Sequence, residues 1–464
     1  MDIRAGATSH DMVENRTFDE IATGDSAVLR RTLVQQDIDL LAVIAGGGSG
    51  GEGASAGPIV TGLVSLLVAT ELPGPGGVTL AQELAFQGPV SAGDALVLTL
   101  AVTGRVAETR ELVLSCECRT EAGRAVASGT IHVRAPDEKI RRPRVELPDI
   151  RMSRHERFRA LMAEAASSAP PVAAVAHPCS APAIAAAAEA ADAGIVVPIL
   201  VGPRGRIEQA AAEAGVAIDR FRLVEAPHSH AAAEAAVALV RCGEAALLMK
   251  GSLHTDELLH AVLDRTKGLR TERRLSHVYL MDVPGHPRPL LVTDAAVNIA
   301  PDLAIKRDII QNAIDLAHAM GIALPKVAIL SAVETINPKL ASTLDAAALC
   351  KMTDRGQITG GLVDGPLAFD NAISLEAARE KGIVSPVAGE ADILVVPDLE
   401  AGNILAKQLT FLAGADAAGV VLGARVPIIL TSRADAERTR LASCAVAAKL
   451  ARARLAAAGG EVGA

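Results

Sequence analysis

The sequence predicts an α/β protein whose larger, C-terminal part is built on a mostly parallel sheet, preceded by a smaller α+β domain. In residues 156–464, short runs rich in Val, Ile and Leu alternate with long Ala-rich runs. In residues 1–140, several runs instead alternate apolar with polar residues. The chain has no Trp, one Tyr and six Phe, so its cores must be built from small aliphatic side chains.

The N-terminal domain is expected to span residues 1–140. Strands are predicted at 95–106, 111–120 and 125–136, with charged turns between them. The largely apolar stretch at 58–72 predicts one buried helix. An antiparallel sheet wrapped around this helix is the simplest arrangement. The basic, proline-bearing segment 141–155 is the predicted linker.

The C-terminal domain, residues 156–464, is expected to alternate strands with helices. The predicted strands are VAAVAH, VVPILVG, AALLMKG, HVYLMDV, PLLVTDAAV, KVAILSA, ITGGLVDG, ADILVVPDL and VPIILTS. Such runs are typical of parallel strands buried on both faces. The length of the region predicts two subdomains with a cleft between them. Subdomain I is assigned to 156–290 plus 431–464, and subdomain II to 291–430.

Composition and charge limit the possible partners. A net charge of −9 leaves no extended basic surface for nucleic acid or an anionic membrane. No uninterrupted apolar run reaches the roughly 18 residues of a membrane span, and the start lacks the apolar core of a signal peptide. The six cysteines lack the spacing of a zinc site or a disulfide framework. A cytoplasmic protein without a bound metal is therefore expected.

Polar residues gather where the predicted strands end. Ligands of open α/β sheets bind beyond the carboxyl ends of strands, and the N–H groups of the following helix favour anions. Neither GxxxxGK[ST] nor GxGxxG occurs at these junctions, so the common nucleotide-binding motifs are excluded. The sequence predicts an anion site built from the junctions at 177–180, 250–255, 294–298, 364–371, 398–403 and 431–435.

Four segments of the C-terminal domain resemble the phosphate acetyl/butyryltransferases. They are KGSLHTDELLHAVL, RRLSHVYLMDVP, VDGPLAFDNAIS and the run from VPDLEAGNILAKQ to IILTSRAD, in the order of the family. The resemblance implies a two-subdomain, isopropylmalate-dehydrogenase-like fold and a homodimer or higher homo-oligomer. It also implies reversible transfer of a short acyl group between acyl phosphate and coenzyme A (CoA). The resemblance further implies that the CoA thiol attacks directly, that CoA is a substrate and that no cofactor is needed.

The last of these segments carries the candidate catalytic residues. A free thiol has a pKa of about 8.5, so a nearby carboxylate helps to remove its proton. A guanidinium and a hydroxyl stabilise the charge that develops on the carbonyl oxygen and phosphate. Ser432 and Arg433 align with the Ser-Arg pair of the family. The acetyltransferases carry their base Asp further along, where this chain has Arg438 and Thr439. Asp435 is the nearest carboxylate, and it acts either as the base or as a helix cap.

Five further residues are candidates for substrate binding. Lys250 and Arg274 either bind phosphate groups or belong to the solvated surface. Asp370, Asn371 and Asn403 either orient phosphate or CoA, or simply stabilise turns.

The N-terminal domain resembles the MaoC-like hotdog enoyl-CoA hydratases. The resemblance rests on FDEIATGDS, IVTGLVSLL, LAFQGPVSAGDALVLTLAVTGRV and GTIHVRAPDE. Such hydratases use an Asp and a His in an SGDxNPxH-like segment. Here Gly47 replaces the Asp and Glu52 replaces the His, so the hydratase activity is expected to be lost.

Two alternatives remain open. The first is a bifunctional enoyl-CoA hydratase and phosphate acyltransferase. The second is a non-catalytic acyl-CoA-binding or assembly protein, against which the intact turn at Ser432, Arg433 and Asp435 argues.

Overall fold

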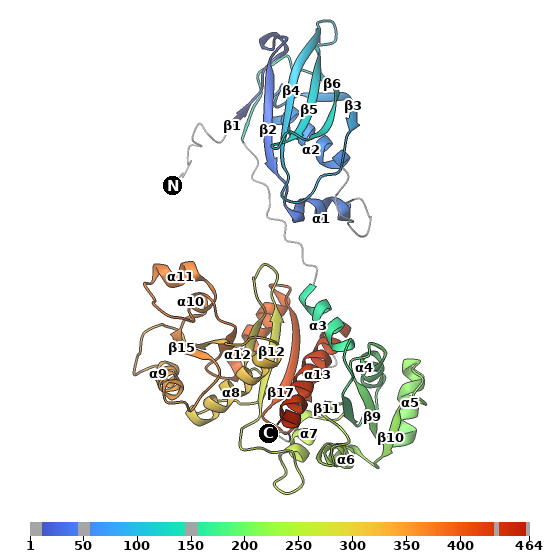
Figure 1. Ribbon diagram of the computed structural model, residues 1–464, viewed down its shortest axis with the longest axis vertical. Coiled ribbons are helices and arrows are strands. Elements are labelled where there is room, and N and C mark those ends of the chain that lie inside the picture. Colours follow the sequence, from blue (N-terminus) through green and yellow to red (C-terminus); the bar gives the residue numbers. More distant parts are fainter. Residues whose placement is uncertain (1–11, 45–55, 144–155, 431–435, 461–464) are drawn as a thin grey trace, which may run out of the picture. The chain divides into compact units, whose positions relative to one another are not determined.

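The computed structural model describes residues 12–44, 56–143, 156–430 and 436–460 (Figure 1). The chain divides into two compact units, Met1–Met152 and Ser153–Ala464. Within the described residues, no helix is both long and apolar enough to cross a membrane.

The first unit contains a five-stranded antiparallel sheet with the strand order β2-β4-β5-β6-β3. Its strands are β2 (Ser26–Thr32), β3 (Val78–Phe86), β4 (Ala95–Val106), β5 (Glu111–Thr120) and β6 (Ala125–Arg134). Its α-helices are α1 (Gln35–Ile44) and α2 (Ala56–Thr70).

Helix α2 and the central strands share one hydrophobic core. Val64 and Leu67 of α2 are buried together with Leu98 of β4 and Leu114 of β5. Buried residues alternate along β4 and β5, as expected for strands with one face toward a core. The predicted hotdog arrangement, a sheet against a buried helix, is therefore present.

The first unit also differs from the prediction. The edge strands β2 and β3 were not predicted, because few of their residues are buried and the alternation is weak. Strand β1 (Met12–Glu14) pairs with β7 (Arg141–Pro143), so residues 141–143 of the predicted linker form a strand. Gly47 and Glu52 lie outside the described residues.

The second unit contains an 11-stranded sheet with the order β10-β9-β8-β11-β18-β17-β12-β13-β16-β14-β15. The strands are β8 (Val172–Ala176), β9 (Val197–Gly202), β10 (Arg222–Glu225), β11 (Leu247–Lys250), β12 (Ser276–Asp282), β13 (Leu290–Thr293), β14 (Lys326–Leu330), β15 (Leu362–Leu367), β16 (Ile393–Val395), β17 (Asp416–Leu422) and β18 (Ile428–Ile429).

Helices of the second unit cover both faces of this sheet (Figure 1). They are α3 (Glu156–Ala166), α4 (Ala181–Asp192), α5 (Arg204–Ala214), α6 (Ser229–Arg241), α7 (Thr255–Leu263), α8 (Leu303–Ala319), α9 (Ala341–Asp354), α10 (Phe369–Ile373), α11 (Leu375–Glu380), α12 (Leu399–Phe411) and α13 (Glu437–Gly460).

Neighbouring residues of one strand show how both faces are buried. Leu247 and Met249 of β11 belong to the core under α8 and α13, whereas Leu248 belongs to the core under α6 and α7. Successive side chains of a strand point to opposite faces, so a continuous apolar run is required here. This confirms the sequence-based interpretation of β11 as a strand buried on both sides.

The sheet consists of two parallel blocks that run in opposite directions. Strands β8, β9, β10, β11 and β18 are parallel, as are β13, β14, β15 and β16. The reversal occurs at β17 and β12, where three consecutive pairings are antiparallel. The carboxyl ends of the two blocks therefore lie at opposite edges of the sheet.

Strands β10 and β17 were not predicted from the sequence. The four residues of β10 form the last strand at one side of the sheet, and β17 contains Ala417, Ala418 and Gly419. Small residues blur the β-branched signal on which the prediction depended. Because one sheet runs through the whole unit, the proposed subdomain boundaries stay a prediction.

Candidate active site

Successive strands of the chain are added on opposite sides of β8, although β8, β9 and β11 all run parallel. Strand β9 follows β8 in the sequence and lies on one side of it, whereas β11 lies on the other side. Such a switch point is where open α/β sheets bind ligands, beyond the carboxyl ends of the strands. The residues that leave the two strands here are His177 after β8, and Lys250, Gly251 and Ser252 at the end of β11.

Strand β18 ends at the same edge of the sheet. It pairs in parallel with β11, with Ile429 opposite Met249. Residue 430 therefore leaves the sheet beside Lys250. The predicted catalytic residues Ser432, Arg433 and Asp435 follow directly but lie outside the described residues.

His177 is held in an unusual conformation at this edge. Its backbone φ is +53°, a value that residues other than glycine seldom adopt. Its N–H donates to the carbonyl of Val201 at 2.7 Å, and its own carbonyl accepts from the N–H and the hydroxyl of Ser252 at 2.9 and 2.8 Å. A Cβ on Gly251 would lie 2.6 Å from that carbonyl oxygen, so the close approach requires glycine.

The imidazole of His177 is buried, and neither ring nitrogen has a hydrogen-bond partner. Burial lowers its pKa, as does the positive charge of Arg206, while the carboxylate of Glu257 acts in the opposite direction. A buried Glu257 oxygen also lacks a partner. Backbone strain and unsatisfied polar atoms are common at functional sites, and both occur here at the switch point.

Lys250 lies at the same edge and is half-buried. Its Nζ donates to the backbone carbonyls of Leu253 at 3.1 Å and Gly251 at 3.3 Å. The structure thus brings one predicted substrate-binding residue to the switch point.

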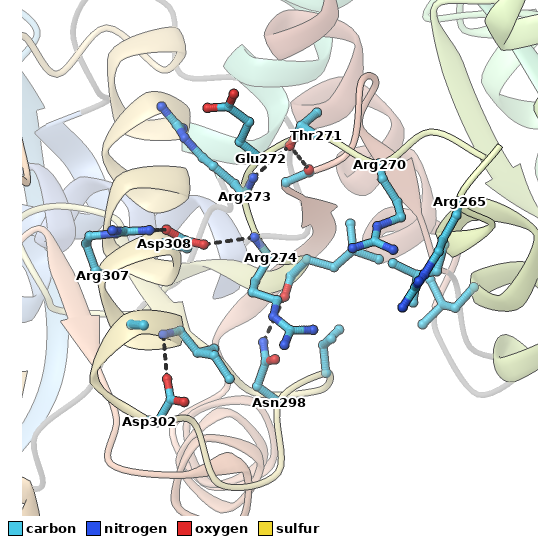
Figure 2. Close-up of a pocket in the computed structure, with 17 residues that line it drawn as sticks. Arg265, Arg270, Thr271, Glu272, Arg273, Arg274, Asn298, Asp302, Arg307 and Asp308 are labelled. Carbon is cyan, nitrogen blue, oxygen red and sulfur yellow. Dashed lines mark hydrogen bonds and ion pairs between the residues drawn. The ribbon is translucent and has the colours of Figure 1, made fainter. Parts of the chain in front are cut away.

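A second feature is a pocket of about 600 Å³, which we call the arginine pocket (Figure 2). It lies where β12 begins, beside the loop between β13 and α8. Predicted residue Arg274 belongs to its wall. The lining also includes Leu259, Leu263, Arg265, Arg270, Thr271, Glu272, Arg273, Leu275, Val297, Asn298, Asp302, Ala304, Ile305, Arg307, Asp308 and Gly423.

Asn403 contacts the loop that forms one wall of this pocket. Its Nδ2 donates to the carbonyl of Ala295 at 3.3 Å. The buried carboxylate of Asp294 accepts from the N–H groups of Val297 and Asn298 at 3.0 and 3.2 Å, which fixes the loop. Asn403 and Arg274 are therefore near the same loop.

Asp370 and Asn371 lie elsewhere, on α10 after β15, the last strand of the sheet. Asp370 is 3.9 Å from the ammonium of Lys381. The carboxamide of Asn371 is fully buried, and neither its nitrogen nor its oxygen has a hydrogen-bond partner. The second unit does not bring these two residues to the switch point or into the lining of the arginine pocket.

Three residues of these sites were not predicted from the sequence: Arg265, Arg270 and Glu257. A signal for the first two was present, because Arg265, Arg270, Arg273 and Arg274 crowd into ten residues of an acidic chain. Within the described ranges, no group of three or more His, Cys, Asp or Glu side chains is arranged to hold a metal ion.

Comparisons with known proteins agree on one family. The model of the phosphate acetyl/butaryl transferase family matches residues 228–448. A phosphate acetyltransferase of Rhizobium meliloti is 65% identical over 297 residues, which cover 64% of this chain and 94% of that protein. A phosphate butyryltransferase of Clostridium acetobutylicum is 45% identical over 58% of this chain and 90% of its own length.

A solved structure agrees. A branched-chain phosphotransacylase from Enterococcus faecalis is 32% identical, with a TM-score of 0.55, over 61% of this chain and 99% of that one. The sequence-based expectation for the C-terminal domain is thereby confirmed: the chain belongs to the phosphate acetyl/butyryltransferase family.

Proposed function

We propose that this protein transfers a short acyl group reversibly between acyl phosphate and CoA. The observation that carries the proposal is family membership over almost the full length of relatives with this activity in their names. The matching relatives include phosphate acetyltransferases and phosphate butyryltransferases, so acetyl phosphate and butyryl phosphate are both candidate substrates. The α/β fold with a switch point at β8 and β11 is compatible with such a site.

In the proposed reaction the CoA sulfur attacks the carbonyl carbon of the acyl phosphate. The carbon–sulfur bond forms, the bond from carbon to the bridging oxygen breaks, and phosphate leaves. Asp435 accepts the thiol proton, while Arg433 and Ser432 stabilise the charge on the carbonyl oxygen and phosphate. The pairing of β18 with β11 supports this assignment, because the strand that leads to these residues ends beside Lys250.

Arg438 supports the choice of Asp435 as the base. It occupies the position where the acetyltransferase branch carries its carboxylate, and its guanidinium is 3.2 Å from Asp416. A paired guanidinium cannot accept the thiol proton. We propose that the reaction needs no cofactor, with CoA acting as a substrate.

The remaining predicted residues are assigned to substrate binding. Lys250 at the switch point and Arg274 in the arginine pocket would bind phosphate groups. Asn403 would orient the substrate through the loop that it contacts at Ala295. We propose that Asp370 and Asn371, which follow β15, orient phosphate or CoA.

The decisive test is CoA-dependent phosphate release from acetyl and butyryl phosphate. Arg433→Ala should lower kcat by about 10²–10³-fold, as expected when one donor to the developing charge is removed. Arg222→Ala is the matched control, because Arg222 is an exposed residue of β10 whose guanidinium pairs with Glu244. The rate of this variant should equal that of the wild type. Equal rates for Arg433→Ala and wild type would refute the assignment of the site.

We further propose a cytoplasmic homodimer or higher homo-oligomer whose partners are acyl phosphate, phosphate and CoA, with no nucleic acid or membrane partner. All six cysteines are free thiols, as is usual in a reducing compartment. For the first unit we propose a hotdog domain without hydratase activity, because its acid and base are replaced by Gly47 and Glu52.

A further inference from the structure

The turn that follows β8 is held in place by its neighbours on both sides. His177 directly follows Ala176, which pairs with Lys250 in the parallel register of β8 and β11. Neighbouring strands of a sheet lie about 4.8 Å apart, so the backbone of His177 passes close to the end of β11. The carbonyl of His177 accepts from Ser252, and its N–H donates to Val201 of β9. The strands on either side therefore fix its left-handed φ of +53°.

Glu257 belongs to the first turn of α7, which begins just after the end of β11. It is the third residue of the helix, and His254 is the N-cap residue. A Glu at this position commonly accepts a hydrogen bond from the backbone N–H of the N-cap residue. Here Oε2 of Glu257 is instead buried and has no hydrogen-bond partner among the described residues. The carboxylate acts electrostatically on the imidazole of His177, which also lacks a hydrogen-bond partner.

Titratable and charged groups from several elements face the imidazole of His177. Burial lowers the pKa of this ring, and Arg206 of α5 and His228 before α6 act in the same direction. The carboxylate of Glu257 favours the protonated ring. The thiol of Cys179, two residues further along the turn, is uncharged because burial raises its pKa. At neutral pH an uncharged imidazole therefore lies near a carboxylate without a hydrogen bond to it.

An anion bound at this edge would change that balance. A phosphate group beside Lys250 adds negative charge near the ring, and negative charge within about 4–6 Å favours the protonated form of an imidazole. We propose that His177 takes up a proton when acyl phosphate binds, and that the protonated ring then pairs with Glu257 and holds the turn that carries Lys250. The inference rests on the proposed function and adds two positioning residues to it. The pair gives a partner to two buried polar groups that otherwise have none.

A proton can reach this pair from the side of α6. The side chain of Glu257 is 19% exposed, and its Oε1 is 4.0 Å from Nε2 of His230. The side chain of His230 is exposed to solvent. Exchange with water through Glu257 therefore remains possible although both ring nitrogens of His177 are buried.

The test measures proton uptake when acetyl phosphate binds to the full-length protein without CoA, so that no acyl transfer occurs. Titration calorimetry at about pH 6, near the ordinary pKa of histidine, is repeated in two buffers of different ionisation enthalpy. The wild type should take up more protons than His177→Asn. Asn is chosen because it tolerates the left-handed backbone conformation. The ionisation of acetyl phosphate is common to both proteins and cancels in the difference.

The pH dependence of binding separates a proton-linked role from a merely structural one. At about pH 8 the free imidazole is uncharged, so wild type and His177→Asn should bind acetyl phosphate with the same Kd. At about pH 6 the Kd of His177→Asn should be about tenfold higher, which corresponds to a pKa change of about one unit on binding. Glu257→Gln, which leaves the backbone of the turn untouched, should lose most of the proton uptake. His318→Gln is the matched control, because His318 is an exposed residue of α8 whose ring contacts the carbonyl of Gly360, and it should behave as the wild type.

The outcomes distinguish this inference from the proposed reaction. Equal proton uptake by wild type and His177→Asn, or a Kd raised equally at both pH values, would overturn the inference even if acyl transfer proceeds. If the wild type shows the His177-dependent uptake but releases no phosphate with CoA, the proposed function fails instead. Thermal midpoints show whether the variants fold. Should His177→Asn not fold, Glu257→Gln decides the question, and undiminished proton uptake in that variant overturns the inference.

Discussion

The hydroxyl of Ser252 donates a 2.8 Å hydrogen bond to the backbone carbonyl of His177. The same hydroxyl accepts a 2.9 Å hydrogen bond from the N–H of Cys179. One side chain at the end of β11 thus fixes the turn that follows β8. Because these two strands form the switch point, the bond joins the two walls of the candidate active site.

Ser252→Ala should therefore weaken both the fold and the site. The change removes two hydrogen bonds of the hydroxyl, although the N–H of Cys179 still donates to the carbonyl of His177 at 2.8 Å. We expect the free energy of unfolding of the second unit to fall by about 0.5–1.5 kcal/mol. Urea unfolding can be followed by tyrosine fluorescence, because Tyr279 is the only tyrosine and there is no tryptophan. Ser167→Ala removes an exposed hydroxyl and should change little. Equal stability of the two variants would contradict the role of Ser252.

The stability of the second unit should fall in mild acid because of His277. Burial lowers the pKa of this imidazole to about 4, against the opposing effect of Asp294. Below about pH 6.5 the unfolded chain binds a proton that the folded protein excludes. The contribution is therefore complete above pH 6.5 and is lost as the pH falls toward 4, with a slope of at most about 1.4 kcal/mol per pH unit.

Urea midpoints at pH 7, 6 and 5 measure this slope. The ring of His277 lies 4.3 Å from that of Tyr279, so the fluorescent residue reports on the same core. His277→Gln should unfold at lower urea concentration but with a flatter pH dependence. If the variant and the wild type show the same slope, the acid sensitivity comes from other groups.

Thiol labelling should separate the cysteines by burial. The thiolate is the reactive form, and burial raises the pKa of Cys444 and Cys116 to about 12 and that of Cys118 to about 11. Cys242 is exposed. At pH 8 a water-soluble disulfide reagent should modify Cys242 first and leave these three unmodified until urea is added. Peptide mass spectrometry identifies the sites, and rapid labelling of Cys444 in the native protein would conflict with the packing around α13.

The full-length protein should not hydrate crotonyl-CoA above background. Hydration needs a positioned acid and base, and their loss costs several orders of magnitude. The decrease in enoyl absorbance measures the reaction, with an active hydratase as the positive control. Hydration that persists in Arg433→Ala would show that the first unit has its own active site and would support the bifunctional alternative.

Periodicity predicted the strands whose side chains are buried most regularly. The continuous apolar run around Leu248 and the alternation around Leu114 leave few other conformations, because burial depends directly on the order of apolar residues. Edge strands such as β2 and β3 expose most of their residues, so the pattern of burial is too weak to predict them.

By itself the sequence determined the family, the two-part organisation of the chain and the likeness of its first part to hotdog hydratases, since these depend on local pattern and motif. Only the tertiary structure decided which junctions meet. It brings Arg265, Arg270 and Arg274 together, places Asn403 beside their loop, and leaves Asn371 at the end of β15. The reason is the strand order β13-β16-β14-β15, which puts β15 at the far side of the sheet from the loop after β13, and this order is not encoded in local sequence.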